Sequence, residues 1–252
     1  MCFPPDAVPP IPPIEGGSGS TRRIILEAVD GNRFNAFEAF PATPGTTAVV
    51  VLPDVRGLFG FYEQLAERFA ERGHRAIAID YFGRTAGVDD RPAEFDFMSH
   101  VQEMTFDGVA ADVAAAARHL RIDSDAVKIF TVGFCLGGSN SWYQASTGLG
   151  LAGAIGFYGH PGRDFPPGGG SVTGRVDRME CPILGLMAGL DKNITPDLVE
   201  AFDETLAAYG IEHEIITYDD APHSFFDRAQ EQYADESADA WQRVLGFIDA
   251  NT

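Results

Sequence analysis

An apolar run at residues 127–134 leads without a break into a glycine-rich turn centred on Cys135. The turn reads GFCLGG, which is the G-x-S-x-G pattern of a nucleophile elbow with a thiol in place of the serine hydroxyl. In such an elbow a strand turns sharply into a helix, and small residues two positions before and after the nucleophile relieve backbone crowding. The segment therefore predicts that a strand, a tight turn and a helix follow one another here.

Strand-like and helix-like segments alternate along most of the chain. Two strand-like runs flank Asp30-Gly31, a dipeptide that favours a hairpin turn, and the run TTAVVVLPD is typical of a strand buried on both faces. Later segments include an alanine-rich helix expected from about residue 97 to 121 and a last helix from about 231 to 250. A starting hairpin followed by repeated β-α units predicts one mostly parallel sheet with helices on both faces.

The N-terminal segment differs in composition from the rest. Residues 1–20 are dense in Pro, Gly and Ser, so we expect an extended arm without regular secondary structure. Residues 21–252 contain no repeat and no linker, and we expect them to form a single domain. The Gly/Pro-rich stretch at 162–178 is interpreted as a long loop inside that domain.

The charge balance and the cysteine count limit the classes of partner and location. With 37 acidic against 18 basic residues, the formal net charge of −19 argues against nucleic acid or an anionic membrane surface. Three cysteines are too few for a disulfide framework or a zinc site. No stretch approaches the roughly 20 apolar residues of a transmembrane helix, and the N-terminus lacks the features of a secretory signal. We therefore expect a cytoplasmic protein with a small-molecule partner.

Cys135 is expected to be a nucleophile rather than a small buried side chain. Its position at a helix N-terminus favours the thiolate, because the helix dipole stabilises negative charge there. After such an elbow an acid and then a histidine follow in chain order, each behind a later strand. Asp191 follows the run LGLMAG, and His223 follows EIITYDD. The order predicts that Asp191 orients the imidazole and that His223 exchanges the thiol proton.

Several residues remain as alternatives for these roles. His160 follows the strand-like run GFYG and could line the pocket without being the base. Asp219 and Asp220 could replace Asp191, although they lie very close in sequence to the histidine. Asp191 itself could instead cap the helix that starts near Thr195.

The remaining parts of the predicted site come from backbone N–H groups and apolar side chains. The oxyanion formed by attack is expected to accept hydrogen bonds from the N–H groups of Leu136 and Val55. Aromatic and apolar residues could wall the pocket, although several could equally be core; they are Phe82, Phe95, Phe97, Met98, Trp142, Tyr158, Phe225 and Phe226.

From about Arg23 to its end, the chain resembles the dienelactone hydrolase family, in the motifs GFCLGG, LPDVRGL, IDYFGR, GFYG, AGLDK and APHSFFD. The resemblance implies an α/β-hydrolase fold and hydrolysis of a carboxylic ester or lactone through an acyl-enzyme on Cys135. It implies no metal and no organic cofactor. It also implies an acidic residue that helps to form the thiolate; Asp54 occupies that place, where the family usually has Glu.

Family members that cleave dienelactone hold its carboxylate with two arginines. The resemblance matches Arg91 loosely to the first of these, and Arg84 in IDYFGR is a further candidate. At the second place the chain has Asp227, with Arg228 next to it. An acid there would repel a carboxylate, which argues against dienelactone itself as the substrate.

Two other functions remain open from the sequence. The same three residues could support a thioesterase or a dehalogenase-type hydrolase. A chain that had lost its activity would be a non-catalytic binding protein of the same fold. The joint presence of Cys135, Asp191 and His223 argues against this last reading, because an inactive relative would be free to lose any of them.

Overall fold

The computed structural model describes residues 7–92, 94–122, 127–165, 169–227, 229 and 231–252. Within these ranges the strands are β1 (Ser18–Glu27), β2 (Arg33–Pro41), β3 (Thr47–Leu52), β4 (Arg75–Ile79), β5 (Lys128–Phe134), β6 (Gly153–Phe157), β7 (Ile183–Ala188) and β8 (His213–Tyr218). The helices are α1 (Gly60–Glu71), α2 (Gly83–Ala86), α3 (Phe97–Glu103), α4 (Phe106–Leu120), α5 (Leu136–Gln144), the short 3₁₀ helix η1 (Thr173–Arg178), α6 (Pro196–Ala208) and α7 (Ala234–Ala250).

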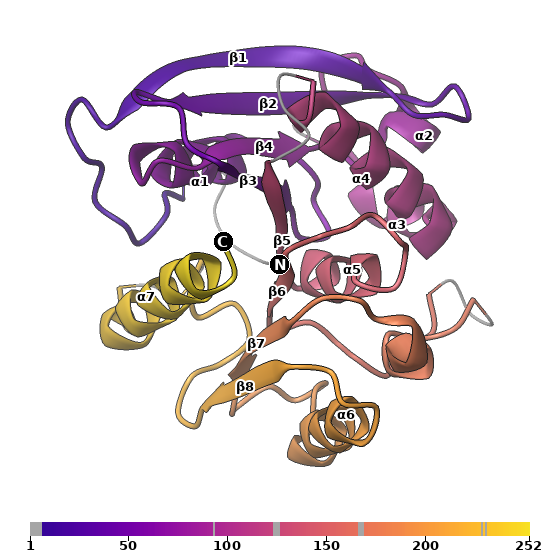
Figure 1. Cartoon of the computed structure of the whole chain (residues 1–252). Coiled ribbons are helices and arrows are strands. Elements are labelled where there is room, and N and C mark those ends of the chain that lie inside the picture. Colours follow the sequence, from indigo (N-terminus) through magenta and orange to yellow (C-terminus); the bar gives the residue numbers. More distant parts are fainter. Residues whose placement is uncertain (1–6, 93, 123–126, 166–168, 228, 230) are drawn as a thin grey trace.

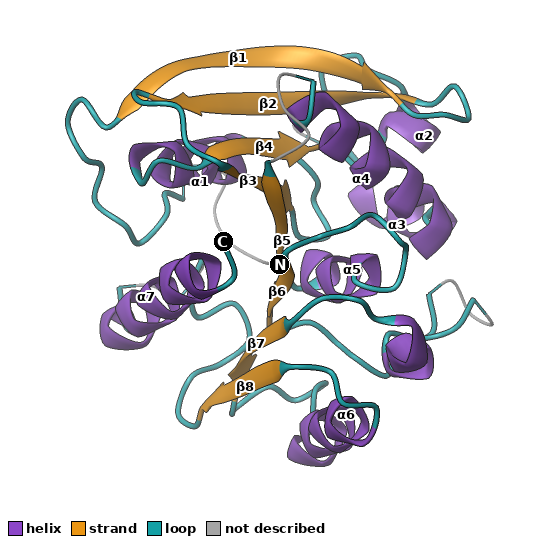
Figure 2. Ribbon diagram, in the orientation of Figure 1, coloured by secondary structure: helices purple, strands orange, loops and turns teal. Residues whose placement is uncertain are grey.

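One eight-stranded sheet runs through the molecule in the order β1-β2-β4-β3-β5-β6-β7-β8. β1 and β2 form the predicted hairpin, β2 pairs with β4 antiparallel, and every pairing from β4 to β8 is parallel. In Figures 1 and 2 the strands follow one another from the hairpin at the top to β8 at the bottom, and the sheet twists between these two ends. The sequence-based prediction of a mostly parallel sheet is confirmed.

Helices cover both faces of this sheet. α1 and α7 lie on one face, and α4, α5 and α6 lie on the other (Figure 1). On the first face Phe69 of α1 packs against Trp241 of α7, with 4.8 Å between ring centroids. On the other face Trp142 of α5 packs against Phe202 of α6 at 5.1 Å. Because each helix buries one apolar stripe, the central strand β3 is buried along its entire length.

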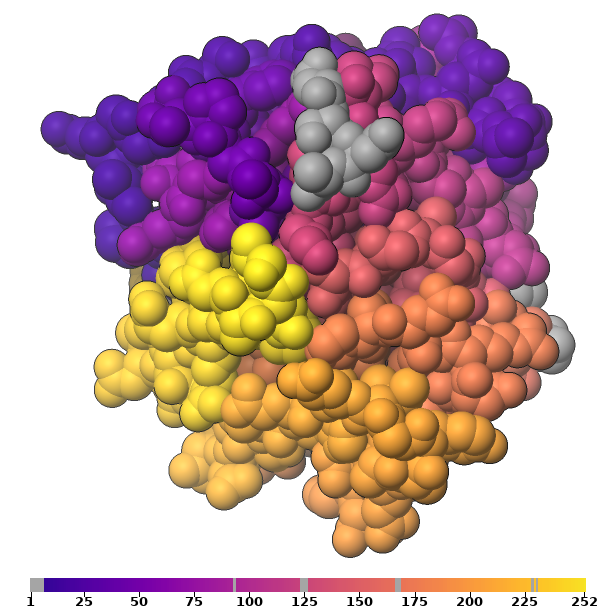
Figure 3. All heavy atoms as spheres, viewed as in Figure 1, coloured from indigo at the N-terminus to yellow at the C-terminus, as the bar shows by residue number. Residues whose placement is uncertain are grey.

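The N-terminal arm is in part built into the domain. β1 begins at Ser18, opposite Pro41 of β2, so the last three residues of the predicted arm belong to the hairpin and not to an irregular segment. Before the strand, Ile11 is only 7% exposed and belongs to the buried cluster of α1. The N–H of Ile14 donates to the carboxylate of Glu71 at 3.0 Å. In the space-filling view the N-terminal part of the chain forms the upper portion of the molecule, and the yellow α7 lies below it on the left (Figure 3).

Two predicted helix boundaries are wrong. The helix expected from about 97 to 121 is two helices, because the backbone of Met104 and Thr105 is extended. The Thr105 hydroxyl accepts the N–H of Gly108 at 3.0 Å, which caps α4 and starts a new helix at that point. The last helix begins at Ala234 and not near Glu231, because a turn in which Ala229 accepts the N–H of Tyr233 precedes it.

The elbow between β5 and α5 depends on the close approach of backbone segments. A Cβ atom at Gly133 would overlap the carbonyl of Gly137, and one at Gly137 would overlap the carbonyl oxygens of Leu52 and Pro53. The two glycines of the G-x-C-x-G pattern are therefore required by space at the point where β3, β5 and α5 meet.

We expect Gly137→Ala to lower the free energy of unfolding by about 3 kcal/mol, because the added methyl group meets rigid backbone and not a movable side chain. The matched control is Gly246→Ala within α7, where a Cβ meets no atom within 4 Å. Alanine there should stabilise the helix by up to about 1 kcal/mol. Urea unfolding of both variants measures the difference, and equal midpoints would contradict the close packing at the elbow.

Candidate active site

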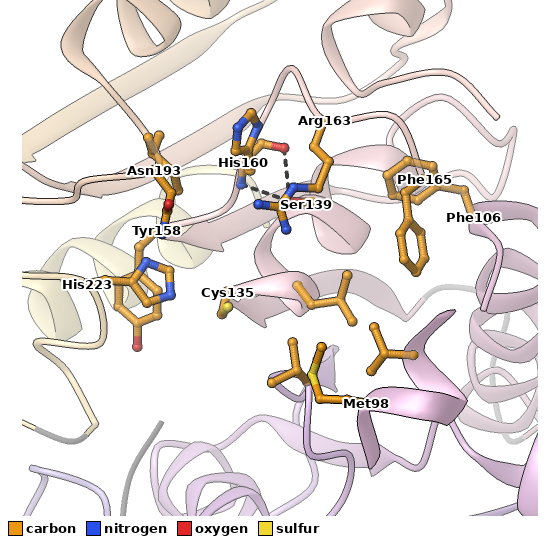
Figure 4. Close-up of a pocket in the computed structure, with 14 residues that line it drawn as sticks. Met98, Phe106, Cys135, Ser139, Tyr158, His160, Arg163, Phe165, Asn193 and His223 are labelled. Atoms are coloured by element: carbon orange, nitrogen blue, oxygen red, sulfur yellow. Dashed lines mark hydrogen bonds between the residues drawn. The ribbon is translucent and has the colours of Figure 1, made fainter. Parts of the chain in front are cut away.

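A cavity of about 750 Å³, counted with its open mouth, lies at the edge of the sheet where the parallel strands end. Its walls come from the loops after β3, β5, β6 and β7, from α3 to α5, and from the loop after β8 (Figure 4). The residues that line it are Val55, Met98, Val101, Phe106, Cys135, Leu136, Ser139, Tyr158, His160, Arg163, Phe165, Asn193, Ile194 and His223.

Cys135 lies at the sharp turn between β5 and α5. Its backbone has φ 56° and ψ −114°, a conformation that is uncommon for a residue with a side chain. The N–H of Cys135 donates to the carbonyl of Phe157 on β6 at 3.0 Å, and the carbonyl of Cys135 accepts the N–H of Gly138 at 3.0 Å. The thiol is free of any disulfide and partly exposed at the cavity. The predicted elbow geometry is present.

His223 and Asp191 come together from two different loops. The Nδ1 atom of His223 lies 2.5 Å from Oδ2 of Asp191, and the Asp191 side chain is only 1% exposed. The other carboxylate oxygen of Asp191 accepts the N–H groups of Asn193 and Ile194 at 2.8 and 3.2 Å. Asp191 therefore shapes its own turn and contacts the imidazole with the same carboxylate. The Thr195 side chain makes no capping bond to α6.

The imidazole of His223 is joined to Cys135 as well as to Asp191. Burial disfavours its charge, but hydrogen bonds with Asp191 and Cys135 outweigh burial and raise the pKa of His223 to about 10. For Asp191 burial acts to raise the pKa, and the hydrogen bonds from His223, Asn193 and Ile194 outweigh it and lower the pKa. At neutral pH the histidine is therefore an imidazolium between a carboxylate and a sulfur atom.

Backbone strain is concentrated at this site. Among the described residues, the non-glycine positions with positive φ are Cys135, Tyr158 and Ser224, the last being the neighbour of His223. Tyr158, at φ 37°, packs its ring 4.9 Å from the His223 ring. Its hydroxyl donates to the buried carboxylate of Asp227 at 2.9 Å. Since strained backbone persists only where its surroundings hold it, the three positions mark a site built for precise placement.

The predicted oxyanion donors Leu136 and Val55 both line the cavity. Leu136 is the first residue of α5, so its N–H has no acceptor within the helix. Within the described ranges, neither N–H group donates to another residue. Both are therefore available to an oxygen atom bound beside the thiol.

Asp54, in the loop after β3, is fully buried. Its carboxylate accepts the backbone N–H of Arg56 at 2.9 Å and lies 3.5 Å from the Arg56 guanidinium. Burial first, and then the charges of Asp54 and Cys135, raise the pKa of Tyr81 well above its usual value. Asp54 and the Cys135 thiol thus both act on the pKa of Tyr81.

The predicted arginine anchors Arg91 and Arg84 do not line the cavity. Arg91 binds the Asp80 carboxylate at 2.7 Å and faces a separate cleft. Arg84 binds the carboxylates of Asp30 and Asp112 at 2.6 and 2.8 Å, which ties the β1–β2 hairpin to α4. Both guanidiniums are paired with acids outside the cavity.

Of the aromatic candidates, only some face the cavity. Met98 and Tyr158 line it, whereas Phe225 is fully buried and packs its ring against Tyr158 and Tyr218. Phe225 therefore belongs to the buried core and does not line the cavity. The remaining sequence-based candidates, Phe82, Phe95, Phe97, Trp142 and Phe226, are also absent from the lining. Arg228 lies outside the described residues.

The cavity also contains residues that the sequence did not single out. Arg163 and Phe165 come from the loop after β6, Phe106 begins α4, and Asn193 and Ile194 follow Asp191. Only the topology could have indicated these residues. The loop after β6 lies at the same edge of the sheet as the loops that carry the catalytic candidates.

Two features are absent from the described part of the chain. No helix there is long and apolar enough to cross a membrane. Within the same ranges, no group of three or more His, Cys, Asp and Glu side chains is arranged to hold a metal ion.

Comparison with known proteins agrees with this fold. Residues 34–251 match the dienelactone hydrolase family. The Escherichia coli K12 protein named "Putative carboxymethylenebutenolidase" is 31% identical over 206 residues, which cover 79% of this chain and 75% of that protein. The carboxymethylenebutenolidase of Rhodococcus opacus is 27% identical over 208 residues, 80% of each chain.

A solved structure shows the same likeness. The crystal structure of a "Putative Dienelactone Hydrolase" from Klebsiella pneumoniae superimposes with a TM-score of 0.77 at 25% identity, covering 92% of this chain and 99% of that one. The family match covers most of the chain, and the elbow, the parallel sheet and the loops at its carboxyl edge agree with it. The chain is therefore a hydrolase that belongs to the dienelactone hydrolase family.

Proposed function

We propose that the protein hydrolyses a small carboxylic ester or lactone with Cys135 as nucleophile, His223 as acid and base, and Asp191 as the residue that orients His223. The observation that supports this most is the continuous contact from the Asp191 carboxylate through His223 to the Cys135 thiol at the edge of an apolar cavity. The names of the curated relatives, which are carboxymethylenebutenolidases, agree with a lactone or ester substrate.

The first half of the reaction transfers the acyl group to sulfur. The raised pKa of His223 keeps the proton on the imidazole, so that Cys135 is a thiolate before substrate arrives. The sulfur attacks the acyl carbonyl, and the oxygen that becomes negative accepts hydrogen bonds from the N–H groups of Leu136 and Val55. When the C–O bond breaks, His223 gives its proton to the leaving oxygen.

The second half returns the enzyme to its starting state. Neutral His223 takes a proton from water, and the hydroxide attacks the thioester carbonyl under the same oxyanion donors. The C–S bond breaks, the carboxylic acid leaves, and the proton on His223 restores the pair with the thiolate. Asp191 keeps Nδ1 of the ring occupied throughout, so that Nε2 is the atom that faces the reaction. The fully buried Asp54 is proposed to assist thiolate formation.

Alkylation by iodoacetamide as a function of pH tests the thiolate. An ordinary thiol with a pKa of about 8.5 loses roughly thirtyfold in rate between pH 7.5 and 6.0, because only the thiolate reacts. We expect the rate at Cys135 to fall by less than about threefold over that range, since the imidazolium of His223 stabilises the anion. Peptide mapping by mass spectrometry assigns the rate to each cysteine.

Cys181 is the internal control for this measurement. It is buried, and burial raises the pKa of its thiol to about 12, so it should stay unmodified while the protein is folded. A Cys135 rate that falls with pH like that of an ordinary thiol would contradict the preformed thiolate.

A further inference from the structure

Tyr158 is a fully buried residue that comes directly after β6 and forms part of the cavity wall. Its N–H donates to the carbonyl of Leu186 on β7 at 2.8 Å, which ties its backbone to the sheet although its φ is 37°. In Figure 4 the rings of Tyr158 and His223 lie together on one side of Cys135. A tyrosine held in this way is a fixed surface on which a neighbouring loop can rest.

The loop that carries His223 is folded around the Tyr158 side chain. The centroids of the His223 and Tyr158 rings lie 4.9 Å apart, at an interplanar angle of 57°. The Phe225 ring meets the tyrosine ring edge-on at 5.6 Å, and the Asp227 carboxylate accepts the tyrosine hydroxyl at 2.9 Å. Within the loop the N–H of Asp227 donates to the carbonyl of Ser224 at 3.3 Å. Three side chains at alternate positions of one loop therefore contact the same tyrosine.

The hydrogen bond between Tyr158 and Asp227 is shielded from water at both ends. The tyrosine is 0% exposed and the aspartate is 1% exposed. Burial first, and then the charge of Asp227, raise the pKa of Tyr158 well above its usual value, so the phenol keeps its proton and donates at neutral and moderately alkaline pH. A hydrogen bond to a carboxylate is stronger than one between neutral groups, and its loss removes a partner from a buried charge. The bond therefore holds the loop firmly.

The imidazole of His223 needs support on its face as well as at Nδ1. The Asp191 carboxylate holds Nδ1 at one edge, and a single contact of this kind leaves the ring free to tilt about it. We propose that Tyr158 is a positioning residue, whose hydroxyl bond to Asp227 holds the His223 loop against the phenol ring. The histidine ring is thereby kept with Nε2 toward Cys135. This inference rests on the proposed function, in which a displacement of a catalytic group by about 1 Å can cost about 10²-fold in rate.

Tyr158→Phe removes the hydroxyl and keeps the ring. We expect it to lower kcat for 4-nitrophenyl butyrate about tenfold and to change KM less than about twofold, because the loop that carries His223 loses its anchor while the cavity walls stay in place. The matched control is Tyr218→Phe. The Tyr218 hydroxyl also donates to an aspartate, Asp239, at 2.8 Å, and its ring also packs on Phe225, but Tyr218 does not line the cavity. The kcat of this control should stay within about twofold of wild type.

The pKa of His223 is the readout that a purely structural role of Tyr158 would not move. Burial lowers this pKa, and hydrogen bonds with Asp191 and Cys135 outweigh burial and raise it to about 10 in the wild type. In Tyr158→Phe a ring that has tilted makes both bonds less well, so the pKa should fall by about 1, which is about tenfold in proton affinity. NMR titration of the imidazole, assigned with a His223→Gln variant, measures this fall. Tyr218→Phe should leave the value in place.

An unchanged pKa of His223 in Tyr158→Phe would overturn the inference, because the ring would then keep both of its bonds without the hydroxyl. The titration needs no turnover. A fall in this pKa supports the positioning role even if the wild type hydrolyses no ester, an outcome that would refute the proposed function alone.

Asp227→Asn is the second variant. Its amide oxygen can still accept the hydrogen bond from the Tyr158 hydroxyl, so the pKa of His223 should lie between those of the wild type and Tyr158→Phe. A larger fall in Asp227→Asn than in Tyr158→Phe would also overturn the inference, because Asp227 would then act on the histidine through a contact other than the one with Tyr158.

Discussion

Cys135→Ala is expected to lower kcat/KM for 4-nitrophenyl butyrate by about 10⁴-fold or more, because removal of the nucleophile of such a triad leaves only the oxyanion donors and binding. The variant should remain folded. A methyl group replaces a thiol at a partly exposed turn, and the backbone of Cys135 is held by its bonds to Phe157 and Gly138. Steady-state kinetics measure the loss, and circular dichroism and thermal unfolding check the fold.

Cys181→Ala provides the comparison for this variant. Cys181 lies in the buried cluster between α5 and α6, far from the elbow in sequence, and its replacement should leave kcat/KM within about twofold of wild type with at most a modest loss of stability. Mass spectrometry after acid quenching should find the butyryl group on the peptide of Cys135 in the wild type. Hydrolysis that survives Cys135→Ala, or an acyl group on another residue, would refute the nucleophile.

The sequence predicted the framework of this site because that framework follows from local spacing and from topology. Gly133 and Gly137 predict a turn in which backbone segments approach one another closely, and the structure has that turn. The order of Cys135, Asp191 and His223 along the chain follows from parallel strands whose carboxyl ends meet at one edge. Cys135 and His223, which are 88 positions apart in sequence, are thereby brought to one cavity, with Asp191 bound to the histidine.

The surroundings of the arginines could not be predicted in the same way. What a long charged side chain does depends on which acids the tertiary structure brings near it. The partner of Arg84 on the hairpin, Asp30, is 54 residues away, and its partner on α4, Asp112, is 28 residues away. The sequence also did not predict that Arg163 lines the cavity. Its segment has the composition of a loop, and only the position after β6 indicates that it faces the cavity.

The sequence also predicted one continuous helix where the structure has α3 and α4. An apolar period of 3.6 residues continues from α3 into α4, and composition alone does not reveal where a threonine will cap. Thr105 acts as an N-cap because its backbone is extended and its hydroxyl meets the N–H of Gly108. The break brings Met98 and Val101 of α3 and Phe106 of α4 to one wall of the cavity, so a detail invisible in the pattern shapes the pocket.

Asp191→Asn is expected to lower kcat/KM by about 10³-fold while the loop keeps its shape. The amide oxygen can still accept the N–H groups of Asn193 and Ile194, but the carboxylate that holds Nδ1 of His223 is gone. In a serine protease triad the corresponding exchange costs about 10⁴-fold, because the imidazole adopts the wrong tautomer. The loss should appear in kcat more than in KM, since Asp191 does not line the cavity.

The pH profile of Asp191→Asn distinguishes loss of orientation from loss of structure. The hydrogen bond and charge of Asp191 help to raise the pKa of His223 to about 10, so their removal lowers that pKa and the imidazolium loses its proton at a lower pH. The alkaline limb of the kcat/KM profile should therefore move to lower pH in the variant. Asp220→Asn, an exposed carboxyl in the loop before His223, is the control and should leave that limb in place. An unshifted limb in Asp191→Asn would mean that Asp191 shapes its turn without acting on the histidine. A shift confined to this variant would mean that one buried carboxylate sets the charge of His223. The thiolate of Cys135, which that charge stabilises, would then depend on the same carboxylate.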